Sequence, residues 1–112
     1  MNLLVQNNYL HSDLGRFACA IGRSGLTTNK IEGDHKTPVG EFKFQKIYYR
    51  KDRLDDMLFK IPFAVIEKND GWCDDPKSKK YNQLIKLPFK FNFEKLYRND
   101  DIYDIIFVLS FN

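Results

Sequence analysis

The sequence predicts a single, mainly β domain, and three observations lead to that prediction. The chain has 112 residues, which is the size of one modest domain, so we expect one domain over residues 1–112. Ten phenylalanines and six tyrosines fit the pleated, half-buried surface of a sheet. Hydrophobic residues make up 43% of the chain and charged residues 29%, a balance typical of globular rather than disordered proteins.

Two segments in the first half alternate in the way strands do. Residues 16–21 place Phe17, Cys19 and Ile21 on one face and small alanines on the other. Residues 41–49 alternate aromatic with polar side chains, as expected of a strand with one face in water.

Turn-forming residues separate these strands from the next ones. Residues 37–40, Thr-Pro-Val-Gly, predict a type I turn that leads into the second strand. Residues 61–66 form another candidate strand, and Pro62 places it at a strand start or a sheet edge because proline has no N–H to donate. Residues 68–76 are rich in Asn, Asp, Gly and Pro and predict a loop that Trp72 anchors to the body.

The last third of the chain predicts two strands and one helical turn. Residues 84–87 predict a short strand, and Asn92 suggests a cap for a helical turn over residues 93–97. Residues 103–111 are apolar on both faces, as in a central buried strand. Because the chain stops directly after it, we expect that a segment is missing downstream.

One segment allows two interpretations. Between residues 49 and 59, Leu54, Met57 and Leu58 recur at helical spacing, while charged residues separate them. The segment is therefore either one irregular helical turn or a charged loop.

Composition argues against several kinds of partner. The 18 basic and 15 acidic residues are interspersed, with no basic stripe, so we expect no nucleic-acid binding. No apolar run reaches the roughly 18 residues of a membrane span, and the first eight residues lack a secretory signal, so a cytoplasmic location is expected. His11 and His35 do not combine with the two cysteines into a zinc pattern, so no metal or cofactor is expected.

The two cysteines are the first candidates for chemistry. Cys73 lies among aspartates, which disfavour a thiolate, so it is interpreted as a half-buried loop residue rather than a nucleophile. Cys19 shares a strand face with apolar neighbours and is interpreted as a core thiol. A disulfide between them would require an oxidising compartment.

Three further motifs have both a functional and a structural interpretation. Residues 22–25, Gly-Arg-Ser-Gly, could cradle an anion with Arg23 as its partner, but a glycine turn is favoured. The carboxylates of Glu32 and Asp34 could serve acid–base chemistry, but Gly33 between them favours a turn. The aspartates of residues 70–75 do not have the spacing of a calcium-binding EF-hand loop.

Three blocks in this order resemble the L,D-transpeptidase catalytic-domain family, in the branch with a Gly-Trp-Cys-Asp-Asp-Pro loop. The first runs from Cys19-Ala20-Ile21-Gly22-Arg23-Ser24-Gly25 to Thr37-Pro38-Val39-Gly40-Glu41-Phe42, the second is Asp70-Gly71-Trp72-Cys73-Asp74-Asp75-Pro76, and the third is Glu94-Lys95-Leu96-Tyr97-Arg98 with Tyr103-Asp104. The resemblance covers nearly the whole chain. It implies a sandwich-like β domain and a peptidoglycan stem peptide as substrate.

The resemblance also implies a chemistry. In the family, a cysteine thiolate attacks the carbonyl between a diamino acid and a terminal D-alanine, and an amine or water then resolves the thioester. The family's histidine and its Ser/Thr-x-Gly-Cys block follow the strand equivalent to residues 105–109, so neither Cys19 nor Cys73 lies at the nucleophile's place.

These observations lead to one main hypothesis and two alternatives. The main hypothesis is a C-terminally truncated, inactive L,D-transpeptidase homologue with no catalytic residue of its own. The first alternative is a binding module in which Arg23 and Trp72 hold a cell-wall peptide or sugar. The second is the N-terminal part of a split enzyme that a separate C-terminal chain completes with the histidine and the cysteine.

Overall fold

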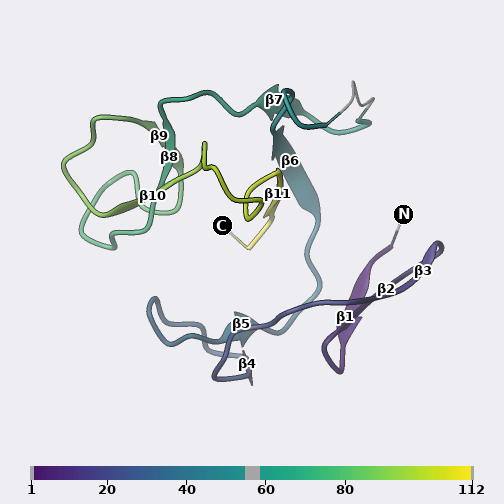
Figure 1. Cartoon of the computed structure of the whole chain (residues 1–112). Helices are drawn as coiled ribbons and strands as arrows, with labels where there is room; N and C mark the ends of the chain where they lie inside the picture. Colours follow the sequence, from purple (N-terminus) through teal and green to yellow (C-terminus); the bar gives the residue numbers. More distant parts are fainter. Residues whose placement is uncertain (1, 55–58, 112) are drawn as a thin grey trace. The chain divides into compact units, whose positions relative to one another are not determined.

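A computed structural model describes residues 2–54 and 59–111, and within them it contains eleven strands and no helix (Figure 1). The predicted mainly β class is confirmed. The chain divides into two compact units, unit 1 (Met1–Glu41) and unit 2 (Phe42–Asn112), and each is described by itself. One domain over residues 1–112 stays a prediction. No helix in the described residues is long and apolar enough to cross a membrane.

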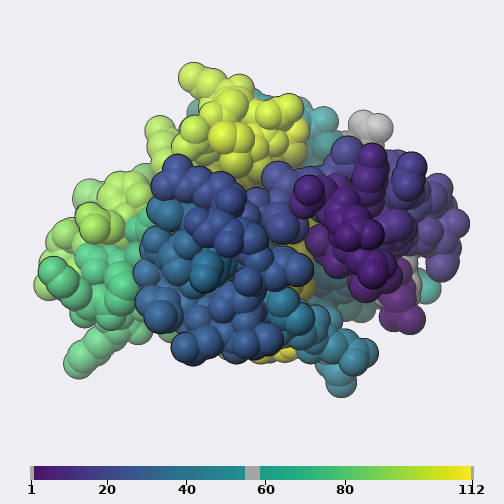
Figure 2. Space-filling model, turned by 90° about the horizontal axis from the view of Figure 1, so that it is seen from below, coloured from purple at the N-terminus to yellow at the C-terminus, as the bar shows by residue number. Residues whose placement is uncertain are grey.

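Unit 1 begins with a three-stranded antiparallel sheet, drawn in purple in Figures 1 and 2. The strands are β1 (Leu4–Gln6), β2 (Tyr9–Ser12) and β3 (Gly15–Ala18), paired in chain order. Asn7 and Asn8 join β1 to β2 with φ values of 54° and 63°. Asparagine tolerates this left-handed conformation, and two such residues make the turn that suits the twist of a hairpin.

The strand predicted for residues 16–21 ends early. Strand β3 stops at Ala18, and the Cys19 amide donates to the Asn8 carbonyl at 2.9 Å before the chain leaves the sheet. Phe17 is 52% exposed, so the face that it was predicted to share with Cys19 and Ile21 is not a core face.

The rest of unit 1 is a pair of very short parallel strands, β4 (Leu26–Thr27) and β5 (Thr37–Pro38). The type I turn predicted for residues 37–40 is therefore wrong. Thr37 donates its amide to the Gly25 carbonyl at 2.9 Å, and Val39 donates to the Thr27 carbonyl at 2.8 Å. Proline fits β5 because its missing N–H leaves these two bonds intact.

Unit 2 contains a mixed sheet in the order β11-β6-β7. Strand β6 (Phe44–Tyr49) confirms the strand predicted for residues 41–49, and β7 (Phe63–Val65) pairs with it in parallel, directly after Pro62. The predicted edge position of that segment is confirmed. Strand β11 (Ile105–Leu109) pairs with β6 in antiparallel fashion (Figure 1).

The central position predicted for residues 103–111 is wrong, because β11 is an edge strand. Ile106 and Val108 pack against the core cluster, while Phe107 lies 5.2 Å from Phe44 between ring centroids and remains 43% exposed. Apolar residues on both faces predict contacts on both faces, but they do not determine the number of neighbouring strands.

A second, antiparallel sheet in unit 2 has the order β10-β8-β9. Its strands are β8 (Asp70–Cys73), β9 (Leu84–Lys86) and β10 (Phe93–Lys95). The strand predicted at residues 84–87 is confirmed. The loop predicted for residues 68–76 is wrong in its middle, where β8 is the central strand, and the helical turn predicted for residues 93–97 is strand β10 instead.

The core of unit 2 draws side chains from both sheets. Tyr48, Ile66 and Leu96 form its buried centre, and Leu96 and Ile66 are each 2% exposed. Half-buried apolar residues pack around this centre: Ala64, Trp72, Leu84, Tyr97, Tyr103, Ile106 and Val108. Of the residues at helical spacing between 49 and 59, Met57 and Leu58 lie outside the described residues.

Candidate functional site

Cys73 is a fully buried thiol on the central strand β8. Its exposed fraction is 0%, and its Sγ points to the Asp75 carbonyl oxygen at 3.9 Å. Its backbone pairs with the segment before β9, since Cys73 N donates to Gln83 O at 3.0 Å and Asn82 N donates to Cys73 O at 2.8 Å. The half-buried loop position predicted for this residue is therefore wrong, because the sheet covers the thiol. Its role in the described structure is to fill the core.

The aspartates on either side of Cys73 accept hydrogen bonds from the protein itself. Asp70, 2% exposed, accepts from the Glu67 amide at 2.8 Å through Oδ2 and from Lys86 through Oδ1. Asp75 accepts from the Lys77 amide at 3.0 Å through Oδ1 and from a backbone amide before β10 through Oδ2. Hydrogen bonds to Asp70 and Glu67 raise the pKa of Lys86. These two carboxylates therefore stabilise the segments that precede and follow β8.

No metal site is found in the part of the chain that the structure describes. Within residues 2–54 and 59–111, no three histidine, cysteine or acidic side chains gather closely enough to hold an ion.

Trp72 has the anchoring role that the sequence suggests. Its Nε1 donates to Asn82 Oδ1 at 2.9 Å, and its ring meets the Tyr48 ring edge-on, with centroids 6.3 Å apart and planes at 70°. The indole also packs against the core cluster. Its hydrogen-bond donor is thus used inside unit 2, and a role in binding substrate stays a prediction.

Two arginines that the sequence analysis missed fasten the segment between β10 and β11. The Arg50 guanidinium, 4% exposed, lies 3.6 Å from the Tyr97 ring centroid and donates to the Arg98 carbonyl at 2.7 Å. It also grips Asp52 with two bonds of 2.8 and 2.7 Å. This pair lowers the pKa of Asp52 to about 2.

Arg53 lies in the same turn as Arg50 and binds the same segment between β10 and β11. Its guanidinium donates to the carbonyls of residues 98, 99 and 100 and to Asp104 Oδ1 at 2.9 Å. Only the Arg50–Asp52 spacing could have signalled such an arrangement, because the other partners lie more than forty residues away in the sequence.

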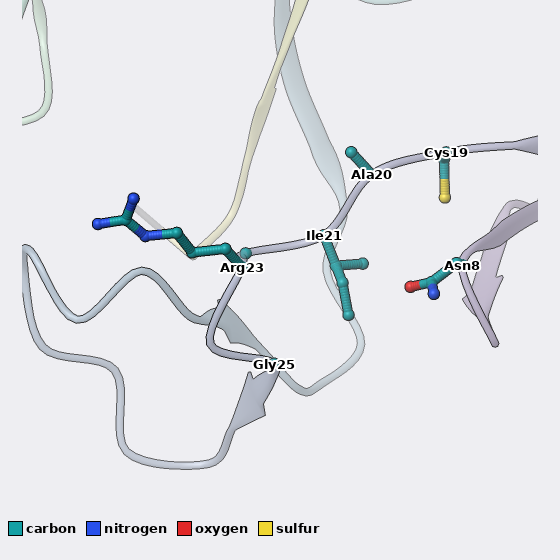
Figure 3. A pocket seen from close by; sticks show the side chains of 7 residues that line it. Asn8, Cys19, Ala20, Ile21, Arg23 and Gly25 are labelled. Carbon is teal, nitrogen blue, oxygen red and sulfur yellow. The ribbon is translucent and has the colours of Figure 1, made fainter.

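The open pocket described in unit 1 has a volume of about 410 Å³ and contains Cys19 (Figure 3). Its lining residues are Asn8, Cys19, Ala20, Ile21, Gly22, Arg23 and Gly25. Cys19 is half-buried, and none of residues 2–41 is buried, so the prediction of a core thiol is wrong. In Figure 3 the Arg23 guanidinium extends away from the Cys19 thiol.

The turn favoured for residues 22–25 is confirmed. Gly25 N donates to the Gly22 carbonyl at 2.9 Å, Ser24 N to the His35 carbonyl at 2.8 Å, and Gly22 N to Thr37 Oγ1 at 2.7 Å. These amides are used within the protein, so they do not form an anion cradle. A Cβ at residue 22 would collide with the His35 backbone, which explains why this position is occupied by glycine.

Arg23 itself has a partner in the same unit. Its Nη2 lies 2.9 Å from His35 Nε2. Because arginine is always a donor, His35 accepts through Nε2 in this arrangement. Arg23 therefore ties the 22–25 turn to His35, two residues before β5, and its role in binding substrate stays a prediction.

The turn favoured for Glu32-Gly33-Asp34 is also confirmed. Gly33 has φ +83°, and the Asp34 amide donates to the Ile31 carbonyl at 3.1 Å. The Asp34 carboxylate accepts from Lys30 Nζ and from the amides of Ile31 and Lys36. The bond with Lys30, with help from these amides, holds the pKa of Asp34 well below its usual range. A carboxylate so stabilised in its ionised form is a poor general acid or base at neutral pH.

Comparison with known protein families matches residues 3–99 to the L,D-transpeptidase catalytic domain. The matched region includes the 19–25 and 70–76 blocks and most of both units. Searches of curated proteins and of solved structures gave no match. Since the family match covers well over half of the chain, this protein belongs to the L,D-transpeptidase catalytic-domain family.

Proposed function

We propose that residues 1–112 form the scaffold part of an L,D-transpeptidase domain that acts on peptidoglycan stem peptides, and that they transfer no acyl group by themselves. Family membership supports the substrate class. The burial of Cys73 is the main observation that supports the absence of acyl transfer by these residues alone.

Cys73 does not meet the geometric demand of nucleophilic attack. A reacting sulfur must come within about 3–3.5 Å of the substrate carbonyl carbon. Cys73 has no exposed surface, and the sheet around it would have to open first.

Cys19 is accessible but lacks a base among the residues that line its pocket. A thiol nucleophile is activated by a base within hydrogen-bond distance, most often a histidine. The described lining of the pocket contains no histidine or carboxylate, and His35 is bonded to Arg23 through Nε2. Covalent catalysis by this polypeptide would therefore need a histidine and a cysteine from other residues or from a second chain.

The experiment is a D-alanine release assay. The 112-residue polypeptide is incubated with a tetrapeptide stem that ends in D-alanine, and released D-alanine is measured over hours. We expect release no faster than that of the Cys19→Ser/Cys73→Ser double variant. Release that one single cysteine variant abolishes would contradict the proposal and identify the nucleophile. Release only after addition of a second polypeptide with the family's histidine and Ser/Thr-x-Gly-Cys block would indicate a split enzyme.

A second candidate function is a binding module for cell-wall peptide or sugar. The open pocket of unit 1, with Arg23 in its lining, supports this candidate because stem peptides carry carboxylates. Sedimentation of the chain with insoluble peptidoglycan tests it, with Arg23→Gln and Trp72→Phe as separate variants. If only Arg23→Gln reduces the bound fraction, the unit 1 pocket is the binding site. Equal binding by both variants and the unmodified chain contradicts this candidate.

A further inference from the structure

The hydrogen bond between Arg23 and His35 depends on the protonation state of the imidazole. Arg23 Nη2 lies 2.9 Å from His35 Nε2, and because arginine only donates, Nε2 must carry a lone pair. Protonation uses that lone pair, so an imidazolium cannot accept the bond and faces the guanidinium as a second cation. Histidine is the side chain whose charge ordinarily changes between about pH 5 and 8. The bond is therefore available to a neutral imidazole and lost in acid.

The backbone keeps these two side chains close to each other even without their bond. Ser24 N donates to the His35 carbonyl at 2.8 Å, and a Cβ at residue 22 would lie only 2.4 Å from the same carbonyl oxygen. Gly22 N donates to Thr37 Oγ1 at 2.7 Å, just beyond His35 in the chain. None of these contacts involves the imidazole or the guanidinium. Protonation of His35 therefore leaves two cations beside each other.

His35 has a backbone conformation that glycine adopts at lower cost. Its φ is +57°, in the left-handed region that residues with a Cβ rarely occupy. Residues in such conformations persist where the surrounding structure fixes them, and they cluster at functional sites and switch regions. A glycine here would keep the backbone bonds and lose the imidazole. The side chain of His35 is thus the feature that needs an explanation, and the structure gives it Arg23 as its partner.

The charged groups around the imidazole lie on the turn that faces it and on its own segment: Arg23 on the first, and Lys30, Glu32, Asp34 and Lys36 on the second. The Asp34 carboxylate is occupied, since it accepts from Lys30 Nζ and from two backbone amides. Glu32 accepts from the Gly33 amide. A protonated His35 therefore adds positive charge beside a guanidinium, an arrangement that favours a bound anion.

We propose that the Arg23–His35 bond is a pH-dependent switch, which holds Arg23 at neutral pH and releases it in mild acid to bind a carboxylate at the unit 1 pocket. Arg23 lines that pocket, and a guanidinium forms paired hydrogen bonds with a carboxylate. This switch rests on the second candidate function and adds the condition under which the pocket binds. At neutral pH the carboxylate competes with His35 for Arg23, whereas in mild acid it meets two cations.

The first test measures the affinity of the unmodified chain for N-acetyl-D-alanine at about pH 5 and about pH 7.5. This probe is a carboxylate that stays ionised over the whole range, so its own charge does not change. NMR titration of the amides of residues 22–25 gives the dissociation constant. We expect binding at least about fourfold tighter at the lower pH, a modest factor because both side chains are exposed.

Variants of the two histidines distinguish the switch from a general effect of acid. His35→Asn has a neutral side chain that tolerates the left-handed backbone, so its two dissociation constants should agree within about twofold. His11→Gln removes the other histidine of the chain and should keep the difference. Equal affinities in the unmodified chain, or a difference that His11→Gln removes, overturn the switch alone. Absence of binding at both pH values contradicts the second candidate function and the switch with it.

The second test needs neither a variant nor a ligand. Because Nε2 accepts from Arg23, the neutral ring of His35 carries its proton on Nδ1. Nitrogen NMR of the imidazoles at about pH 7.5 distinguishes the two tautomers and should show the Nδ1-protonated form for His35. A neutral His35 with its proton on Nε2 contradicts the bond and overturns the proposal, whatever the affinities are.

Discussion

The buried apolar side chains of the described residues all lie in unit 2, and unit 1 contributes none. In unit 2 they are Ile47, Tyr48, Tyr49, Ile66, Cys73, Ile85 and Leu96. In residues 2–41, Val5, Phe17 and Leu26 are each at least half exposed. Unit 1 keeps its shape through strand pairing and through turn bonds such as Ser24 N to His35 O at 2.8 Å.

This difference indicates that the two units resist unfolding by different means. Burial of apolar surface is the main favourable term in folding, while a single hydrogen bond contributes only about 0.5–1.5 kcal/mol net. Local openings at low free energy occur where buried apolar contacts are few. We therefore expect unit 1 to open locally while the core of unit 2 remains folded.

The largest expected effect comes from the core of unit 2. Leu96→Ala removes a side chain that is 2% exposed and should lower the free energy of unfolding by about 2–5 kcal/mol. Leu26→Ala in unit 1, where the side chain is 55% exposed, is the matched control and should change it by less than about 0.5 kcal/mol. Urea denaturation followed by tryptophan fluorescence measures both. Similar losses for the two variants would remove the distinction between the units.

A buried carboxylate offers the next test. Asp70→Ala leaves the Glu67 amide without its 2.8 Å acceptor and should cost about 1–3 kcal/mol in urea denaturation. Asp34→Ala in unit 1 breaks a comparable set of turn bonds around a carboxylate close to the surface. It should leave the global midpoint unchanged and speed amide exchange only near residues 31–36. A shift of the global midpoint by Asp34→Ala would show that unit 1 unfolds together with unit 2.

Substitution of one closely packed glycine in each unit tests how tightly the backbone is packed there. A Cβ at Gly22 would press on the Lys36 backbone at 2.7 Å, and a Cβ at Gly71 would meet Ile85 Cδ1 at 2.9 Å. Gly71→Ala should lower the global free energy of unfolding by about 1–3 kcal/mol, as overpacking does. Gly22→Ala should act only within unit 1, where the amides of Ser24 and Thr37 would exchange faster. Hydrogen exchange with mass spectrometry distinguishes these outcomes, and protection loss across unit 2 in Gly22→Ala would contradict them.

The smallest effect is a change with pH. Burial, together with the hydrogen bond to Glu94, raises the pKa of Tyr103 to about 12, above its usual value of 10.0. The folded state thus holds its proton more tightly than the unfolded state, so the stabilisation is present below pH 10 and is lost as pH rises through 12. Thermal melts between pH 9 and 12 should show a smaller decline for Tyr103→Phe. Equal declines would mean that Tyr103 ionises as in the unfolded chain.

Local patterns predicted those parts of the structure that short-range chemistry controls. Alternation in residues 41–49 identified β6, and the short strand predicted at residues 84–87 contains β9. Pro62 marked a strand start or a sheet edge, because a missing donor is a local property. The turns at residues 22–25 and 32–34 followed from their glycines. The three sequence blocks identified the family, and the family model confirms it.

The errors occurred where distant partners override local preference. Residues 68–76 have the composition of a loop, yet their middle is strand β8. Asp70 accepts a hydrogen bond from the Glu67 amide, and Gly71, which has no Cβ, leaves room for the Ile85 side chain. Strand β8 therefore fits between β9 and β10. The candidate site shows the same limit. Cys73 is buried on β8, the strand between β9 and β10. Arg53 binds backbone carbonyls that lie more than forty residues away in the sequence.

The amino-acid sequence by itself determined the mainly β class, the family and the turns at residues 22–25 and 32–34, because these depend on aromatic content and side-chain alternation, on glycine chemistry and on short ordered motifs. Only the tertiary structure decided which cysteine is buried, that β11 lies at an edge, and which arginines bind backbone carbonyls. Those properties depend on contacts between residues far apart in the chain, and no local pattern specifies them.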